Sequence, residues 1–338
     1  MLAVPFDAAR LTPVGQPIAV LNLPAGVGGL PALAVSRTGA LVYAPTSATG
    51  RFVWTSRDGV EQPLNETLHA YANPRISPDG RRIVVQSSGD LWVQDVARGT
   101  FTRLTSNDAQ PVSYPVWTPD GQRVVFRTGN GMRVIAADGS GREEAIAATS
   151  LNDYPSSGSP DGKTLVFARL GSATTSADVY VVSLEPKAEP RALVSTPAYE
   201  GGPRFSPDGR WLTYVSNESG QMQIYVRPFP GPDRKWQVST QGGTHPVWNG
   251  NGKELFYRVG NKMMAVEMAA GAEPTLSQPK QLFDLRYAFG ANQSMADYDV
   301  SPDGRRFVMI KDESGANRLN VVLNWFDELT RRVPTPER

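Results

Sequence analysis

Short runs of β-branched and aromatic residues recur along the chain, each five residues long and each preceded by a polar turn. The clearest are Arg82–Gln86, Arg123–Arg127, Thr164–Ala168, Trp211–Val215, Glu254–Arg258 and Arg306–Ile310. Runs of this length and composition are typical of buried strands. A helical period is visible only near the end of the chain, at Trp325–Arg331. The pattern predicts an all-β protein built from many short strands.

The turn before each run has the form Ser-Pro-Asp-Gly or a variant of it. Pro presets φ for the first corner, Asp suits the second, and Gly accepts the left-handed conformation that closes the hairpin. The seven copies, of which the first and the sixth are weaker, are Ser36–Gly39, Ser77–Gly80, Thr118–Gly121, Ser159–Gly162, Ser206–Gly209, Asn249–Gly252 and Ser301–Gly304. Their closing glycines recur every 41 to 52 residues. This is the period of a propeller blade with four strands.

Further strand-like runs complete each repeat, and we therefore predict one domain over residues 1–338, a β-propeller of four-stranded blades. Seven turns indicate seven blades, while six or eight stay open because the end repeats are ambiguous. The last repeat lacks a clear fourth strand, and strand-like segments in residues 1–23 precede the first turn. We expect an N-terminal strand to complete the last blade and close the ring. The start in mid-blade is also consistent with a fragment of a longer protein.

Composition removes several classes of function. The 338 residues include 32 Gly and 28 Pro, many of them in the turns, but no Cys. Disulfides, thiolate metal sites and thiol nucleophiles are therefore excluded. The net charge of +1 does not favour a nucleic-acid partner. No apolar run approaches the ~20 residues of a membrane-spanning helix, and no signal peptide is visible, so we expect no membrane insertion and leave the compartment open.

The repeat Tyr-Pro-x-Trp-(Ser/Thr)-Pro-Asp-Gly resembles that of TolB-like propellers, with its best copies at Tyr114–Phe126, Gly202–Pro230 and Asp299–Ile310. The stretch Gly201–Val226 and the ending LNVVLNWFDEL are similar to the propeller that follows the kinase domain in some bacterial serine/threonine kinases. The resemblance implies a sensor or interaction module and a bacterial extracytoplasmic location. The chain has no Gly-rich nucleotide loop and no HRD or DFG motif, so no kinase activity is implied.

Candidate site residues come from the segments that lead into the innermost strands, because propeller sites usually surround the central channel. Equivalent repeat positions are expected to form one ring, and we predict that it binds ligand through Asn73, Arg75, Tyr114, Asp153, Tyr154, Glu200, Arg204 and Asp299. Arg75 and Arg204 each follow a Pro and stand two residues before a turn, so they could form a cationic wall for a carboxylate or phosphate. Pairing with an acidic residue of a neighbouring blade, or a solvated rim, are the alternatives. Gly158 stands where other repeats have a large aromatic residue, which predicts looser packing beside the channel.

Two hypotheses for function follow. The first is a non-catalytic, monomeric propeller without cofactor that binds a protein, peptide or small ligand at its loop face and channel mouth. The second is a hydrolase of esters, lactones or phosphotriesters, with Ca²⁺ or another divalent metal in the channel. Its metal ligands would be Asn73, Asp153, Glu200, Asp297 and Asp299, and its base His245 or His69. We favour the first, because the repeat accounts for nearly every distinctive residue.

Overall fold

The computed structural model of the chain describes residues 2–7, 10–20, 33–43, 50–106, 110–146, 148–171, 176–185, 187–269, 271, 273–285, 295–313 and 320–333. These residues belong to two units. One unit is Arg51–Lys311, and the other joins Met1–Gly50 to Asp312–Arg338.

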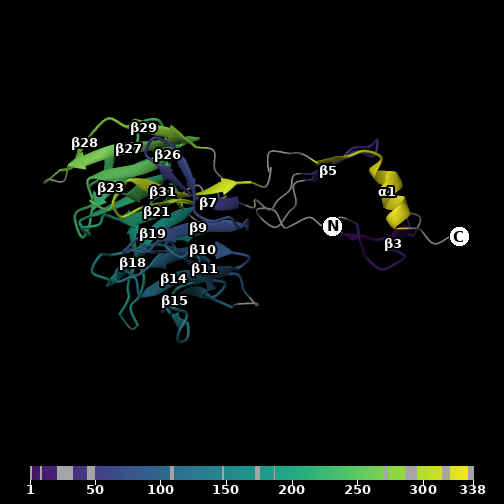
Figure 1. Cartoon of the computed structure of the whole chain (residues 1–338), viewed down its shortest axis with the longest axis horizontal. Helices are drawn as coiled ribbons and strands as arrows, with labels where there is room; N and C mark the ends of the chain where they lie inside the picture. Colours follow the sequence, from purple (N-terminus) through teal and green to yellow (C-terminus); the bar gives the residue numbers. More distant parts are fainter. Residues whose placement is uncertain are drawn as a thin grey trace. The chain divides into compact units, whose positions relative to one another are not determined.

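The larger unit consists of antiparallel sheets that follow one another along the chain, which we number as blades (Figure 1). Blade 1 contains β9 (Tyr71–Ile76), β10 (Arg82–Ser87), β11 (Asp90–Asp95) and β12 (Phe101–Arg103). Blade 2 contains β13 (Ser113–Trp117), β14 (Arg123–Thr128), β15 (Gly131–Ala136) and β16 (Glu144–Ala145). Blade 3 contains β17 (Asp153–Gly158), β18 (Thr164–Leu170), β19 (Ala177–Ser183) and β20 (Arg191–Val194).

The remaining blades complete the unit. Blade 4 contains β21 (Glu200–Phe205), β22 (Trp211–Ser216), β23 (Gln223–Pro228) and β24 (Trp236–Gln237). Blade 5 contains β25 (Thr244–Trp248), β26 (Glu254–Val259) and β27 (Lys262–Ala269), with β28 (Thr275–Leu276) and β29 (Lys280–Asp284) both paired to β27. Blade 6 contains β30 (Asp299–Val300) and β31 (Arg306–Asp312) with β7 (Gly50–Ser56) and β8 (Glu61–Pro63).

The first strands of the blades form a closed ring. In order, β9 contacts β13, β13 contacts β17, β17 contacts β21, β21 contacts β25, β25 contacts β30, and β30 contacts β9 again. The prediction of a propeller with four-stranded blades is confirmed. The number seven is not confirmed, because the described residues form six blades, five with four strands and blade 5 with five.

Blade 6 closes the ring with strands from both ends of the unit. The yellow strand β31 lies beside the purple-blue strand β7, and β8 pairs with the other side of β7 (Figure 1). Lys311 Nζ donates to Glu61 Oε2 at 2.6 Å across 250 residues of chain. An N-terminal segment does close the ring, but it is not residues 1–23 as predicted. Those residues form the pairs β1 (Leu2–Ala3) with β4 (Ile18–Ala19) and β2 (Phe6–Asp7) with β3 (Thr12–Pro13).

The smaller unit explains why seven turns give six blades. Its turn Ser36–Gly39 joins β5 (Leu33–Val35) to β6 (Leu41–Tyr43), and β6 pairs with β32 (Asn320–Val322) in a three-stranded sheet. The predicted helical segment is α1 (Trp325–Arg332), which follows β32. Val20, Leu41, Trp325 and Val333 form the buried core of this unit. Across the described part of the chain, no helix is both long and apolar enough to span a membrane.

Each apolar core of the larger unit lies between two neighbouring blades. Successive residues of a strand point to opposite faces of its sheet. In β10, Val84 packs toward blade 2, beside Phe126, whereas Ile83 and Val85 pack toward blade 6, beside Phe52. Both faces of the sheet are thus buried, which explains the uninterrupted apolar runs of the sequence.

The Ser-Pro-Asp-Gly turns are held by one repeated set of hydrogen bonds. In the turn of blade 2, Thr118 Oγ1 donates to Asp120 Oδ1 at 2.5 Å, and the backbone N–H of Gln122 donates to the same oxygen at 2.9 Å. The hydroxyl also accepts from the backbone N–H of Arg123 at 3.0 Å. The hydrogen bond from Thr118, supported by that from Gln122, lowers the pKa of Asp120.

We expect Asp120→Asn to make the free energy of unfolding depend less strongly on pH in the acid range. Folding lowers the pKa of Asp120, so its stabilisation is complete above the ordinary value of 3.8 and is lost as the pH falls through the lowered value. Chemical denaturation between pH 5 and 2 measures the slope of unfolding free energy against pH, which should be smaller in the variant. Glu189→Gln, an equal loss of charge at an exposed loop residue, is the control. Equal slopes in wild type and Asp120→Asn would contradict this account.

Gly158 has room for a side chain, as predicted from its place in the repeat. A Cβ built there would lie 3.9 Å from Pro119 Cδ and 3.9 Å from the Trp117 carbonyl oxygen. At Gly243, in contrast, a Cβ would lie 2.7 Å from Ser239 Oγ and 2.9 Å from Ile224 Cγ1.

We therefore expect Gly158→Ala to raise the free energy of unfolding by about 0.4–1 kcal/mol, because it restricts the unfolded chain without a clash in the native strand. The matched variant Gly243→Ala should lower it by about 1–3 kcal/mol through overpacking. Urea denaturation of both variants gives the two values. A destabilised Gly158→Ala would show that the space beside this strand is needed by the native packing.

Candidate functional site

The inner strands share a bulge near the entrance of the channel. The pairing of five of them with their second strands shifts register at this point. In four blades the bulge holds a residue with positive φ, four positions before the turn: Asn73 (φ 52), Tyr114 (φ 55), Gly202 (φ 57) and His245 (φ 59). Left-handed backbone is unfavourable for residues other than glycine, and strain of this kind concentrates at functional sites.

The centre of the ring holds side chains that meet across the channel. Arg204 Nη1 lies 3.4 Å from Asp299 Oδ1, although β21 and β30 are two places apart in the ring. Asp299 Oδ2 also accepts from the backbone N–H of Ile76 in blade 1 at 2.9 Å. Three predicted ligand residues, Arg75, Arg204 and Asp299, are thereby brought together, since Arg75 interacts electrostatically with both others.

Arg75 is buried, with 7% of its surface exposed. Its Nη1 donates to the carbonyl oxygen of Pro74 at 2.7 Å, and its own carbonyl accepts from Trp117 Nε1 of blade 2 at 2.8 Å. Burial, and after it repulsion from Arg204, lowers the pKa of Arg75 to about 9. Attraction to Asp299 and Asp297 raises this pKa and offsets part of the effect. Of the two alternatives weighed in the sequence analysis, pairing to an acid of another blade is seen for Arg204 with Asp299, and the cationic wall for a ligand stays a prediction.

A second arginine–carboxylate pair adjoins the first. Arg258 of β26 lies 3.3 Å from Asp297 Oδ2, and burial lowers the pKa of Arg258. Between the two aspartates, Tyr298 is fully buried and donates its hydroxyl to the carbonyl oxygen of His245 at 2.9 Å. Burial raises the pKa of Tyr298, so this residue stays a neutral donor.

The carboxylates predicted to bind metal do not gather into one cluster. Asp153 is buried and accepts from Arg169 at 2.6 and 2.9 Å within its own blade. Glu200 accepts from the hydroxyl of Thr196 at 2.5 Å, and burial raises its pKa. Throughout the described residues, no three His, Asp or Glu side chains are grouped as a metal ion would require. Asp153 and Glu200 thus each have a partner within their own blade, and the metal site of the sequence analysis stays a prediction.

The two histidines occupy different settings. His245 is buried, and its Nδ1 lies 2.8 Å from Thr244 Oγ1. His69 packs edge-on against Tyr71, at 5.5 Å between ring centroids. It lines a pocket of about 150 Å³ with the aromatic residues Tyr71, Trp92 and Phe101. The assignment of either histidine as a base stays a prediction.

Tyr114 and Tyr154, two of the predicted ligand residues, pack together on neighbouring inner strands. Their rings meet edge to face, with 5.1 Å between centroids. The Arg127 guanidinium covers the Tyr154 ring at 4.6 Å. This aromatic pair gives blades 2 and 3 a surface suited to an apolar or planar group.

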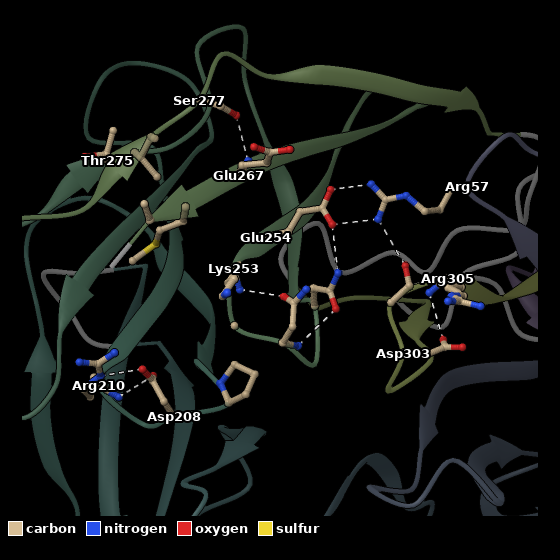
Figure 2. A pocket seen from close by; sticks show the side chains of 18 residues that line it. Arg57, Asp208, Arg210, Lys253, Glu254, Glu267, Thr275, Ser277, Asp303 and Arg305 are labelled. Carbon is tan, nitrogen blue, oxygen red and sulfur yellow. Dashed lines mark hydrogen bonds and ion pairs between the residues drawn. The ribbon is translucent and has the colours of Figure 1, made fainter. Parts of the chain in front are cut away.

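A larger groove of about 1180 Å³ lies among the turns of blades 4, 5 and 6 (Figure 2). Arg57, in the hairpin between β7 and β8, donates to both oxygens of Glu254 at 2.6 and 2.8 Å. It also donates to the carbonyl oxygen of Gly304 at 3.3 Å. Burial alone would raise the pKa of Glu254, but hydrogen bonds from Arg57 and Asn249 bring it below its ordinary value. Arg57 and Glu254 thus form an ion pair in the groove, and this pair ties blade 5 to blade 6.

The model of the TolB β-propeller domain matches residues 132–328, more than half of the chain. The chain belongs to this family. An uncharacterized protein of Agrobacterium fabrum, Atu1656, is 25% identical over 273 residues, which are 73% of this chain and 86% of the relative. The Tol-Pal system protein TolB of Bordetella pertussis is 26% identical over 148 residues, 44% of this chain, and the chain spans only 34% of that protein.

Solved structures agree on the fold. A TolB-type protein from Agrobacterium tumefaciens superimposes with a TM-score of 0.63 at 20% identity, covering 78% of this chain and 98% of the other. At this identity the likeness shows the TolB propeller fold and nothing finer. The resemblance to kinase-linked propellers stays a prediction.

Sequence reasoning missed three members of the ring. Arg258 is one of three arginines, with Arg127 and Arg169, that pair with the first residue of an inner strand. This recurrence at one repeat position is a signal that the sequence does contain. Trp248, like Trp117, donates its indole N–H to the carbonyl oxygen of the arginine in the preceding blade, at 3.3 Å to Arg204. Tyr298 carries no comparable signal.

We expect Arg57→Ala to lower the free energy of unfolding by about 1 kcal/mol, because a two-bond arginine–carboxylate contact is lost at a partly exposed site. In the control Arg210→Ala, the partner Asp208 belongs to the same turn and the arginine side chain is 70% exposed, so the change should stay within about 0.5 kcal/mol. Urea denaturation measures both. Equal effects would mean that the contact does not contribute to ring closure.

Proposed function

We propose that this TolB-family propeller is a non-catalytic binding module that takes a protein, peptide or small ligand at its loop face and channel mouth. The loop face is the side on which the chain enters the inner strands. The relative from Bordetella pertussis is a protein of the Tol-Pal system, which supports a role in interaction. Blade 6 is completed by β7 and β8 of the same chain, and we propose that the unit acts as a monomer toward its partner.

The observation that carries this proposal is the engagement of the ring carboxylates. Asp153 is held by Arg169, Glu200 by Thr196, and Asp299 by Arg204 and a backbone N–H. A divalent metal ion needs several oxygen ligands in one place, and the described residues do not bring three His, Asp or Glu side chains together. Binding requires only shape and donors, which Tyr114, Tyr154 and the arginines supply.

A screen of peptides and small molecules by thermal shift tests the proposal, with Tyr154→Ala as the informative variant. Removing this ring takes away the aromatic surface of the mouth and should weaken bound ligands about tenfold. Tyr180→Ala is the matched control, since Tyr180 lies on the third strand of the same blade and is covered by Arg169 at 4.4 Å. Ligands should bind Tyr180→Ala as they bind wild type.

The same preparations are assayed on aryl esters, lactones and phosphotriesters, where we expect no turnover. Metal-sensitive turnover that disappears in Glu200→Ala or His245→Ala would overturn the proposal in favour of a hydrolase. Ligands that bind equally well to wild type and Tyr154→Ala would remove the channel mouth as the site.

A further inference from the structure

The centre of the ring carries more positive than negative charge. Three arginines, Arg75, Arg204 and Arg258, meet two aspartates, Asp297 and Asp299. Because these side chains are largely removed from water, their imbalance is weakly screened. One further negative charge would neutralise the group.

Arg75 and Arg204 each have an N–H group without a hydrogen-bond partner among the described residues. Arg75 Nε and Arg204 Nη2 are both buried, and neither has a hydrogen-bond acceptor there. A buried donor that is left unmatched costs free energy, and it commonly marks the place of a water or an ion. Arg75 and Arg204 lie on β9 and β21, which are three places apart and therefore opposite each other in the ring.

The repulsion between these arginines favours an anion between them. Arg204 is the second cause, after burial, of the lowered pKa of Arg75. A negative group between the two guanidinium groups would replace repulsion by two attractive contacts. Arginine is suited to this role because its planar fork matches the oxygens of a carboxylate or a phosphate.

Arg204 is also accessible and only loosely engaged. Its side chain is 14% exposed and that of Asp299 is 13% exposed, so solvent reaches this pair. Their contact of 3.4 Å is long for a charge-assisted hydrogen bond, which is usually about 2.7–2.9 Å. Little is lost when Arg204 turns part of its fork toward a ligand.

We propose that the ring centre binds one compact oxyanionic group, a carboxylate or a phosphate, between the guanidinium groups of Arg75 and Arg204. This rests on the proposed function, because it names the chemical class of the ligand at that site. Asp297 and Asp299 restrict the site to a single anionic group, since a second one would meet their carboxylates. The anion accepts hydrogen bonds from Arg75 Nε and Arg204 Nη2, which have no acceptor among the described residues.

Titration of the 338-residue chain with sodium acetate or sodium phosphate, at constant ionic strength, tests the proposal. The melting temperature should rise in a saturable way with one of the two anions, which identifies the chemistry. In Arg75→Gln and Arg204→Gln the apparent dissociation constant should increase about ten- to hundredfold, the effect of losing charge-assisted hydrogen bonds. The matched control Arg210→Gln, an exposed arginine on the turn side, should respond as wild type does.

A second measurement keeps the test independent of how the variants fold. Crystals of the wild-type chain in selenate should show an anomalous peak between Arg75 and Arg204. A peak elsewhere, or a melting response lost in Arg210→Gln but kept in Arg204→Gln, would overturn the proposal. If ligands bind the loop face in a Tyr154-dependent way but neither anion raises the melting temperature, the anion site is contradicted and the proposed function is not. If an anion raises the melting temperature but no ligand binds the loop face in a Tyr154-dependent way, the proposed function is contradicted and the anion site is not.

Discussion

The convergence of six inner strands on one axis controls the chemistry of this molecule. Residues that are more than 90 positions apart in sequence, such as Arg204 and Asp299, have to share one small polar volume. The backbone there is anchored from the neighbouring blade, through Trp117 to the Arg75 carbonyl and through Trp248 to the Arg204 carbonyl. The arginines are therefore held by their main chains, while parts of their side chains stay unmatched.

Around this axis, stability comes from repetition. Apolar residues of each strand alternate between the two neighbouring blades, as Val84 and Val85 do, so every sheet is buried on both faces. The turns add the same hydroxyl-to-carboxylate bond in blade after blade. A chain without cysteine thus forms a closed ring from strand pairing, packing, turn hydrogen bonds and ion pairs, with no disulfide.

The repeat made the strands, the turns and the propeller predictable, because each depends on a few neighbouring residues. The blade number was not predictable, since the turn Ser36–Gly39 has the same local chemistry whether its hairpin enters a blade or the sheet of β5, β6 and β32. Repeat position correctly brought Arg75, Arg204 and Asp299 together. It did not predict the partners of Asp153 and Glu200, because position in a strand does not reveal that Arg169 or Thr196 donates to the carboxylate.

Closure by β7 and β31 also sets an order for synthesis on the ribosome. Glu61 of β8 is made 250 residues before its partner Lys311 of β31. At about 5–20 residues per second, β7 and β8 wait for roughly 12–50 s before the strand that completes their sheet emerges. During this interval blades 1 to 5 can assemble, while the edge of β7 stays unpaired. Within the larger unit, β7 and β8 are therefore the first strands to be made, and the ring can close only once β30 and β31 have followed the five other blades.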